Sequence, residues 1–247
     1  MSRPLLLVFF MLFLNGCQNG LRTQGVRTYY ENGSIKEEYY VNPDSSQHKH
    51  FIYNNYRVGI YKLYYPSRNI KVYCFYKDNR KDSLYISFYE NGTIKEKLYY
   101  QNGELFGEQF YYYANAHLAR YAVVDGFGNV IYVQKFDSLG SRFCDEGVAV
   151  SPDFYCPACH GDTAYAEQIL INTMISRPIG KHIEVYLGTQ DKTTYKRELL
   201  EANSNNVVAF NIKLHKGLNF FDVIAEIVDS SDNSHKSDTL HRKVYFK

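Results

Sequence analysis

The feature that most constrains this chain is a repeat of 24 residues in its first half. The segment Tyr89-Glu-Asn-Gly-Thr-Ile-Lys95 has a close copy that starts at Tyr30, and weaker copies start at Tyr65 and Tyr113. The interval from Tyr30 to Tyr65 is 35 residues, one period plus an insertion of 11, for which polar residues 42–49 are the natural place. A fixed period of this length indicates a chain built from stacked copies of one small structural unit.

The repeat predicts hairpins, because Glu-Asn-Gly between tyrosine-rich segments supplies the positive φ angles that a tight turn needs. The second and fourth copies carry Arg68 and Ala116 where the others have the turn glycine. The expected turn residues are Asn32, Gly33, Asn91, Gly92, Asn102 and Gly103. The expected antiparallel strands are residues 61–65, 70–76, 84–89, 94–100, 106–113 and 118–124.

Tyrosine dominates the repeat region and favours a sheet in which side chains are half-buried. The chain has 25 Tyr, 16 Phe and no Trp, and most of the Tyr lie between Tyr29 and Tyr132. A Tyr ring packs well on a pleated surface while its hydroxyl reaches water. Neighbouring residues such as Tyr99 and Tyr100 must point to opposite faces of a strand, so both faces of this sheet carry aromatic rings. The same composition argues against a helical bundle.

The amino terminus predicts export from the cytoplasm. An apolar run over residues 5–14 follows Arg3 and precedes a polar segment, which is typical of a secretory signal peptide. The run is too short to span a bilayer, which takes about 20 residues in a helix. At its end, Leu14-Asn-Gly-Cys17 resembles the lipobox of bacterial lipoproteins.

The lipobox resemblance implies that residues 1–16 are removed as a leader and that Cys17 receives lipid. Acyl chains on Cys17 would anchor the protein to a membrane through a tether of residues 17–26. Gln18 follows the cysteine in place of the Asp that is associated with retention in the inner membrane. We therefore expect the outer membrane of the cell envelope, with the periplasmic or the surface side left open.

The unit Tyr-x-Asn-Gly-x-Ile-Lys, with Gly103 and Gly107 ahead of the next aromatic pair, resembles the variant MORN repeat of the YwqK-type antitoxin family. The resemblance covers roughly residues 27–136 and implies an antiparallel repeat sheet. The antitoxin activity does not suit a protein anchored in the envelope, because such a protein would not meet a cytoplasmic toxin. We therefore take only the fold from this resemblance and predict a MORN-like sheet over residues 27–140.

The second half of the chain predicts a different domain, because the period ends and Tyr becomes rarer after residue 140. Seven short runs of alternating or β-branched residues, separated by polar turns, are typical of a β-sandwich. Lys216-Gly-Leu-Asn219 resembles the Gly-x-Asn corner of bacterial immunoglobulin-like domains, and an irregular α+β module is the alternative. The expected strands are residues 148–151, 165–172, 183–187, 193–199, 207–213, 219–229 and 239–246. The predicted fold class is therefore all-β, an antiparallel Tyr-rich repeat meander followed by an immunoglobulin-like β-sandwich over residues 141–247.

Cys156-Pro-Ala-Cys159-His160 is the sharpest chemical motif of the chain and has four interpretations. C-x-x-C-H is the attachment signature of c-type haem, in which both thiols form thioethers and the His ligates iron. Cys-Pro-x-Cys also resembles a thioredoxin-like redox dithiol, and zinc bound together with Cys144 is a third interpretation. We favour the fourth, a structural disulfide that is either local or made to Cys144, because an even number of cysteines remains once Cys17 carries lipid. The cysteines whose connectivity stays open are Cys74, Cys144, Cys156 and Cys159.

Composition and motifs exclude several classes of function. The 28 Lys and Arg nearly balance 26 acidic residues, so no basic face for nucleic acid is expected. The sequence has no GxSxG, HExxH or P-loop motif and no basis for a catalytic carboxylate pair, so we expect no enzyme, metal site or cofactor. We predict a lipid-anchored binding or assembly module whose exposed Tyr rings contact a protein or a glycan. An envelope redox or c-type haem protein that uses the Cys156–His160 motif is the alternative.

Overall fold

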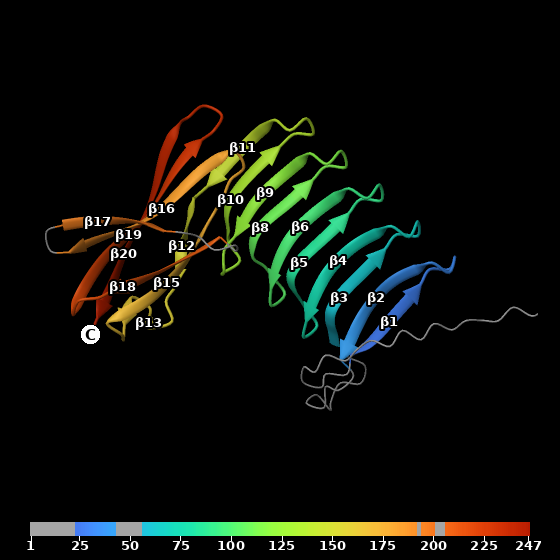
Figure 1. Cartoon of the computed structure of the whole chain (residues 1–247), viewed down its shortest axis with the longest axis horizontal. Coiled ribbons are helices and arrows are strands. Elements are labelled where there is room, and N and C mark those ends of the chain that lie inside the picture. Colours follow the sequence, from blue (N-terminus) through green and yellow to red (C-terminus); the bar gives the residue numbers. More distant parts are fainter. Residues whose placement is uncertain (1–22, 43–55, 192–193, 201–205) are drawn as a thin grey trace, which may run out of the picture.

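The computed structural model describes residues 23–42, 56–191, 194–200 and 206–247, and within them every regular element is a β-strand (Figure 1). The predicted leader, Cys17 and most of the polar insertion lie outside the described residues. The strands form one long sheet and two smaller sheets, which confirms the predicted all-β class.

The first sheet is an antiparallel meander in which the strands lie side by side in chain order, as Figure 1 shows. It contains 11 strands, of which the short β7 pairs with β6 and lies off the main path. The predicted meander is therefore present, and the six predicted ranges overlap six of its strands, whereas the other five strands were not predicted individually. The bounds are β1 Gln24–Tyr29, β2 Ile35–Asn42, β3 Tyr56–Tyr64, β4 Ile70–Lys77, β5 Arg80–Phe88, β6 Ile94–Gln101, β7 Glu104–Leu105, β8 Gly107–Tyr112, β9 Leu118–Val124, β10 Val130–Phe136 and β11 Arg142–Gly147.

Five hairpin turns, all at the same end of the strands of this sheet, share one geometry. In the turn that begins at Tyr89, the N–H of Tyr89 donates to the carbonyl of Thr93 (2.8 Å), and the N–H of Gly92 donates to the carbonyl of Tyr89 (2.9 Å). The fourth residue of each turn has a positive φ, a conformation that glycine adopts without steric cost. The five residues are Gly33 (78°), Arg68 (71°), Gly92 (85°), Ala116 (67°) and Gly140 (90°). The copies that lack glycine therefore keep the turn.

The sheet is longer than the predicted 27–140 segment at both ends. β1 begins at Gln24, inside the segment expected to be a tether. At the other end, the fifth turn, Asp137–Ser141, leads into β11, which pairs with β10 and belongs to the first sheet rather than to the second domain. This turn escapes the sequence pattern, because Asp137 stands where the other copies have Tyr.

One face of the repeat sheet carries two similar clusters of a cation and Tyr rings, placed 24 residues apart. The guanidinium carbon of Arg57 lies 5.0 Å from the ring centroid of Tyr61 and 5.6 Å from that of Tyr76. One period later, Lys81 Nζ lies 4.5 Å from the ring centroid of Tyr85. Such contacts contribute about 0.5–1 kcal/mol each at exposed sites. The clusters shield part of this face from water with the sheet's own side chains.

The second half of the chain is a β-sandwich, as predicted. Its three-stranded sheet has the order β12-β15-β18, and its six-stranded sheet has the order β13-β14-β20-β19-β16-β17. The bounds are β12 Val150–Tyr155, β13 Cys159–His160, β14 Thr163–Ala164, β15 Gln168–Ile175, β16 Lys181–Asp191, β17 Thr194–Leu200, β18 Val207–Lys213, β19 Gly217–Asp229 and β20 His235–Phe246. Alternate residues of both sheets point inward and form one core, which includes Ile169, Ile171, Val208, Val223 and Ala225.

Specific contacts join the repeat sheet to the sandwich. The side-chain amide of Gln134, fully buried in β10, donates to the carbonyl of Ile179 (3.1 Å) and accepts from its N–H (2.8 Å). Gly147 ends β11 with a φ of 121°, and a Cβ at this position would lie 2.3 Å from the carbonyl oxygen of Ile131. The chain can therefore pass from one part to the other at this point only with glycine.

Candidate functional site

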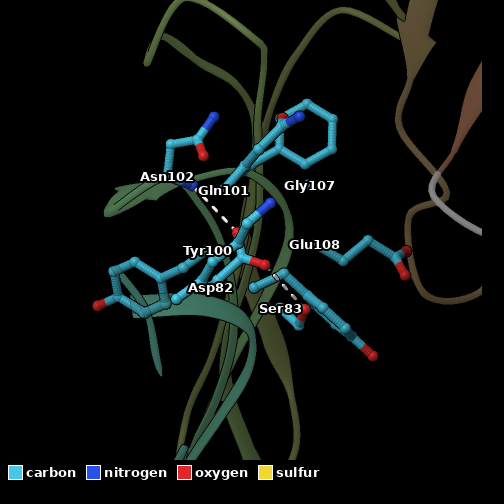
Figure 2. A pocket seen from close by; sticks show the side chains of 10 residues that line it. Asp82, Ser83, Tyr100, Gln101, Asn102, Gly107 and Glu108 are labelled. Atoms are coloured by element: carbon cyan, nitrogen blue, oxygen red, sulfur yellow. Dashed lines mark hydrogen bonds between the residues drawn. The ribbon is translucent and has the colours of Figure 1, made fainter. Parts of the chain in front are cut away.

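A groove at the junction of the repeat sheet and the sandwich is the candidate site. It consists of two hollows of about 650 and 510 Å³ that share Gln101 and Phe106 in their linings, and we call the two together the junction groove. Residues of the repeat sheet alone line the first hollow, and residues of both parts of the chain line the second. The first hollow, shown in Figure 2, is also lined by Lys77, Asp82, Ser83, Tyr99, Tyr100, Asn102, Gly107 and Glu108. The second is also lined by Asp125, Gly126, Phe127, Ser151, Tyr155, Asn172, Thr173, Met174 and Val207.

The first hollow forms where the regular hairpin pattern is interrupted between β6 and β8. The N–H of Asn102 donates to Asp82 Oδ1 (3.2 Å), and this bond connects the turn after β6 to the neighbouring strand β5. The N–H of Phe106 donates to the carbonyl of Tyr99 (2.9 Å), and Gly107 then turns the chain with a φ of 73°. The interruption leaves an opening that side chains of β5, β6 and β8 border.

Gln109 stabilises this interruption from the inside. Its side-chain amide, only 1% exposed, donates to the carbonyls of Phe106 (3.0 Å) and Gly107 (3.2 Å). The two preceding copies of the repeat have Tyr61 and Tyr85 at this position. The amide that stands here in place of a ring therefore bonds the backbone carbonyls at the bend.

Two aromatic side chains, Phe127 and Tyr155, flank the second hollow. Phe127 is 64% exposed in the turn between β9 and β10, and Tyr155 is 62% exposed at the end of β12. The buried carboxylate of Asp125 accepts from the N–H groups of Phe127 (2.9 Å) and Asn129 (2.8 Å). These bonds hold the backbone of the turn while leaving the Phe127 ring in contact with solvent.

The floor of the second hollow is apolar and belongs to the contact between the two parts of the chain. Met174, from the sandwich, is buried against Tyr121 and Val123 of β9, and Val207 packs on the same cluster. The N–H of Arg177 donates to the Tyr121 hydroxyl (3.0 Å), so the floor is also held by a hydrogen bond between the two parts.

Amides and carboxylates supply the polar part of the groove. Within the described residues, the side-chain amides of Gln101 and Asn172 make no hydrogen bond to another residue. Glu108 Oε1 accepts from the Tyr121 hydroxyl (2.9 Å). Burial, together with the adjacent Glu108 carboxylate, raises the pKa of Tyr121, so this hydroxyl stays protonated and keeps donating. The groove therefore offers amide donors and acceptors beside carboxylates that are held in place.

A charged cluster reinforces the junction. Asp145 of β11 accepts a hydrogen bond from the Tyr132 hydroxyl and lies 2.9 Å from Lys181 Nζ and 3.1 Å from Arg142. Burial alone would raise the pKa of Asp145, but the hydrogen bonds from Tyr132 and Lys181 outweigh it and lower the pKa below its ordinary value. Arg142 also pairs with Asp229 of the sandwich (2.9 Å), so the cluster spans both parts of the chain.

The predicted turn residues lie at the two ends of the strands of the repeat sheet, and among these residues only Asn102 lines the groove. The residues in turns at the end away from the groove are Asn32, Gly33, Asn91 and Gly92. Asn102 and Gly103 form the two-residue turn after β6, at the opposite end of the strands, where Asn102 lines the first hollow.

Sequence reasoning missed the two aromatic residues that flank the groove. The segment Asp125-Gly-Phe-Gly-Asn129 has a glycine on each side of Phe127, a signal that could have identified an aromatic residue displayed on a turn. Tyr155 carries no comparable signal, because it is one more aromatic residue in a predicted β-rich segment.

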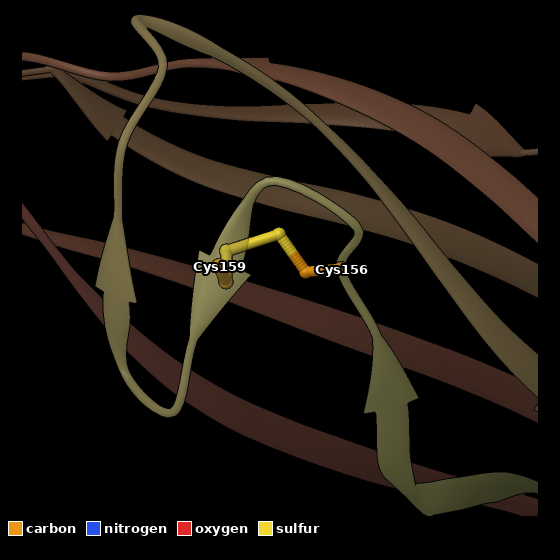
Figure 3. The surroundings of a disulfide bond; sticks show 2 residues. All are labelled: Cys156 and Cys159. Carbon is orange, nitrogen blue, oxygen red and sulfur yellow. A yellow bond between two sulfur atoms is a disulfide. The ribbon is translucent and has the colours of Figure 1, made fainter.

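Cys156, in the loop after β12, and Cys159, the first residue of β13, form a disulfide, which Figure 3 shows. The bond is local, so the alternative pairing with Cys144 does not form, and Cys144 and the buried Cys74 are both unpaired. His160 is exposed on β13, next to the disulfide. The motif thus lies in a β-hairpin rather than at the start of a helix, where a low thiol pKa favours redox chemistry.

The disulfide bears on the other interpretations of the motif. Its two sulfur atoms are bonded to each other, so in this form neither is a thiol that could bind haem covalently. Across the residues that the structure describes, no three His, Cys, Asp or Glu side chains lie close enough together to hold a metal ion. The geometry therefore fits the structural disulfide best.

Comparisons with known proteins do not place the chain in a family. No protein-family model matches the chain, and no curated protein matches it. None of the residues that the structure describes belongs to a helix that could span a bilayer.

Proposed function

We propose that this protein is a lipid-anchored protein of the cell envelope that acts as a binding module, with the junction groove as its binding site. The observation that carries the proposal is the pair of rings, Phe127 and Tyr155, which flank a hollow and remain 64% and 62% exposed. A ligand that covers these rings removes apolar surface from water, which favours binding in proportion to the area covered. Hollows with an apolar floor and a few polar groups are the usual form of ligand sites.

The proposed anchor rests on the sequence of the amino terminus. Residues 1–16 resemble a lipoprotein leader, and Cys17 is the residue that would carry lipid. Only seven residue steps separate Cys17 from Gln24, the first residue of β1, and they can span at most about 25 Å. An anchored protein would therefore hold β1, and not the sandwich, next to the membrane.

The repeat sheet would serve as an arm between the anchor and the groove. Its path runs from β1 to β9 in seven strand-to-strand steps of about 4.8 Å, or roughly 34 Å along the sheet. In Figure 1, β1 lies at one end of the sheet and the sandwich at the other. This arrangement supports a protein that presents its groove at a set distance from the membrane. The resemblance of the two parts to MORN repeats and to immunoglobulin-like domains belongs to the same proposal.

Replacement of the lipobox cysteine tests the anchor. In cells, Cys17→Ala should accumulate as unlipidated precursor or as released soluble protein, and it should not incorporate a labelled fatty acid. Cys144→Ala is the matched control, because this cysteine is unpaired and lies on β11 of the folded sheet, outside the lipobox. Equal labelling and equal detergent partitioning of Cys17→Ala and the wild type would contradict the anchor.

A photo-crosslinking amino acid tests the groove in cells. We expect a covalent adduct when the probe replaces Phe127, because this residue lines the second hollow. We expect none when it replaces Phe143, which is 68% exposed on β11 and does not line the groove. Adducts at neither position, or equally at both, would contradict a binding site in the groove.

A further inference from the structure

We propose that the junction groove binds a short neutral oligosaccharide, with Phe127 and Tyr155 as the two stacking surfaces. This inference rests on the proposed function, since it names the ligand class of the same groove. The two rings come from different sheets, Phe127 from the β9–β10 turn of the repeat sheet and Tyr155 from β12 of the sandwich. A sugar presents an apolar face of C–H groups, and an exposed ring at the wall of a hollow is suited to cover such a face.

The backbone around Phe127 is already held in place before any ligand arrives. Asp125 is 2% exposed and accepts from the N–H groups of Phe127 (2.9 Å) and Asn129 (2.8 Å). A side chain on a pre-organised turn loses little conformational entropy when it is covered, and this favours binding. Phe127 is 64% exposed on this turn and lines the second hollow, so a role in binding accounts for its exposure.

The polar side chains of the groove match sugar hydroxyls. The amides of Gln101 and Asn172 each carry both a donor and an acceptor, and a hydroxyl both donates and accepts. Neither amide is hydrogen-bonded to a residue in the described part of the chain. In the first hollow, Asn102 and Glu108 add an amide and a carboxylate from the turn after β6 and from β8, as Figure 2 shows.

The charge of the groove selects against anionic ligands. Its lining includes three carboxylates, those of Asp82, Glu108 and Asp125, against one cation, Lys77. A phosphate or a nucleic acid requires an excess of Lys and Arg, because its binding depends on neutralising the phosphate charge. The lining therefore favours an uncharged ligand rich in hydroxyls.

The size of the groove favours a small ligand, such as a short sugar chain, over a protein partner. The hollows of about 650 and 510 Å³ each lie within the range of about 300–1,000 Å³ that is usual for small-ligand sites. A stable protein partner would instead need roughly 800 Å² of matching surface on each side. Because Gln101 and Phe106 line both hollows, the two are neighbours, and an extended chain of a few sugar units is the form of ligand that would reach from one to the other.

Calorimetric titration of the full-length lipidated protein tests the inference, in a detergent that has no sugar headgroup. The probes are the tetrasaccharide of N-acetylglucosamine, cellotetraose and maltotetraose, each raised to millimolar concentration. We expect at least one of them to bind with a millimolar or lower Kd. Phe127→Ala and Tyr155→Ala should each weaken that binding about tenfold, whereas Phe143→Ala, which truncates an exposed ring outside the groove, should not.

The outcomes separate the inference from the proposed function. Absence of binding by all three probes to folded protein would overturn the inference, and so would binding that both alanine variants leave unchanged. If none of the sugars binds but the probe at position 127 captures a protein in cells, the binding function stands and the sugar ligand is wrong. Unfolded variants are recognised by circular dichroism, and in that case Tyr155→Leu provides a replacement without an aromatic ring.

Discussion

The hydroxyl of Tyr89 donates a hydrogen bond to the backbone carbonyl of Tyr112, 2.8 Å away and 23 residues later. Tyr112 is the residue that precedes the next turn, so the side chain of one turn is bonded to the backbone of its neighbour. Three other turns repeat this contact, through the pairs Tyr30–Tyr64, Tyr65–Phe88 and Tyr113–Phe136. The first Tyr of the repeat therefore connects neighbouring hairpins at the ends of their strands, next to the turns.

Removal of one such link should destabilise the sheet. Tyr89→Phe deletes the hydroxyl and leaves the ring, so we expect a loss of about 0.5–1.5 kcal/mol in the free energy of unfolding, measured by urea denaturation. Tyr29→Phe is the control, because the Tyr29 side chain is 59% exposed. Equal stability of the two variants would show that the link contributes nothing.

Substitution of the fourth residue of the turn should change the stability of the protein in opposite directions in two copies of the repeat. Gly92→Val should cost about 1–2 kcal/mol, because a β-branched residue is forced to a φ of 85°. No atom lies within 4 Å of a Cβ built at Gly92, so this cost is conformational and involves no clash. Ala116→Gly should stabilise by about 1 kcal/mol, because Ala116 already holds a φ of 67°. Thermal melting of both variants measures the pair, and a stabilising Gly92→Val would refute the shared geometry.

The junction should weaken in acid because of Asp145. Its pKa lies below the ordinary value of 3.8 in the folded protein, so the ionised form stabilises the fold. This contribution is complete above about pH 4 and is lost as the pH falls through the lowered pKa. We expect Asp145→Asn to lower the free energy of unfolding at pH 7 by about 1–3 kcal/mol and to flatten its decrease between pH 4 and pH 2. Asp162→Asn, at an exposed position, is the control and should change the free energy of unfolding at pH 7 by less than about 0.5 kcal/mol.

The cysteines should differ sharply in reactivity. Cys74 is 1% exposed, and burial raises the pKa of its thiol to about 11, so it should resist alkylation at pH 8 until the protein unfolds. Cys144 is partly exposed and should react in the native state. Cys156 and Cys159 should react only after reduction, as mapped by mass spectrometry of alkylated peptides. Free thiols at both positions in protein purified without reductant would reopen the redox and haem interpretations.

The architecture of the repeat sheet was predictable because its determinants are local. A turn at Asn102-Gly103 depends on the freedom of two adjacent residues to adopt positive φ, and the flanking strands follow from short apolar and aromatic runs. The disulfide was predictable only in part. Two residues lie between Cys156 and Cys159, which permits a local bond, but the preference for this bond over one to Cys144 depends on where the chain runs after β11.

The sequence by itself determined the β class, the period of the sheet, most of its turns and the presence of a second β-rich part, but not the residue at which that part starts. The tertiary structure alone decided the groove, because Phe127 and Tyr155 belong to different sheets and neither carries a pattern that refers to the other. They lie on one hollow because Gln134 binds the backbone of Ile179 and because Gly147 lets the chain pass within contact distance of Ile131. Such contacts join residues far apart in the chain, so they depend on how two finished surfaces pack, which no local propensity encodes.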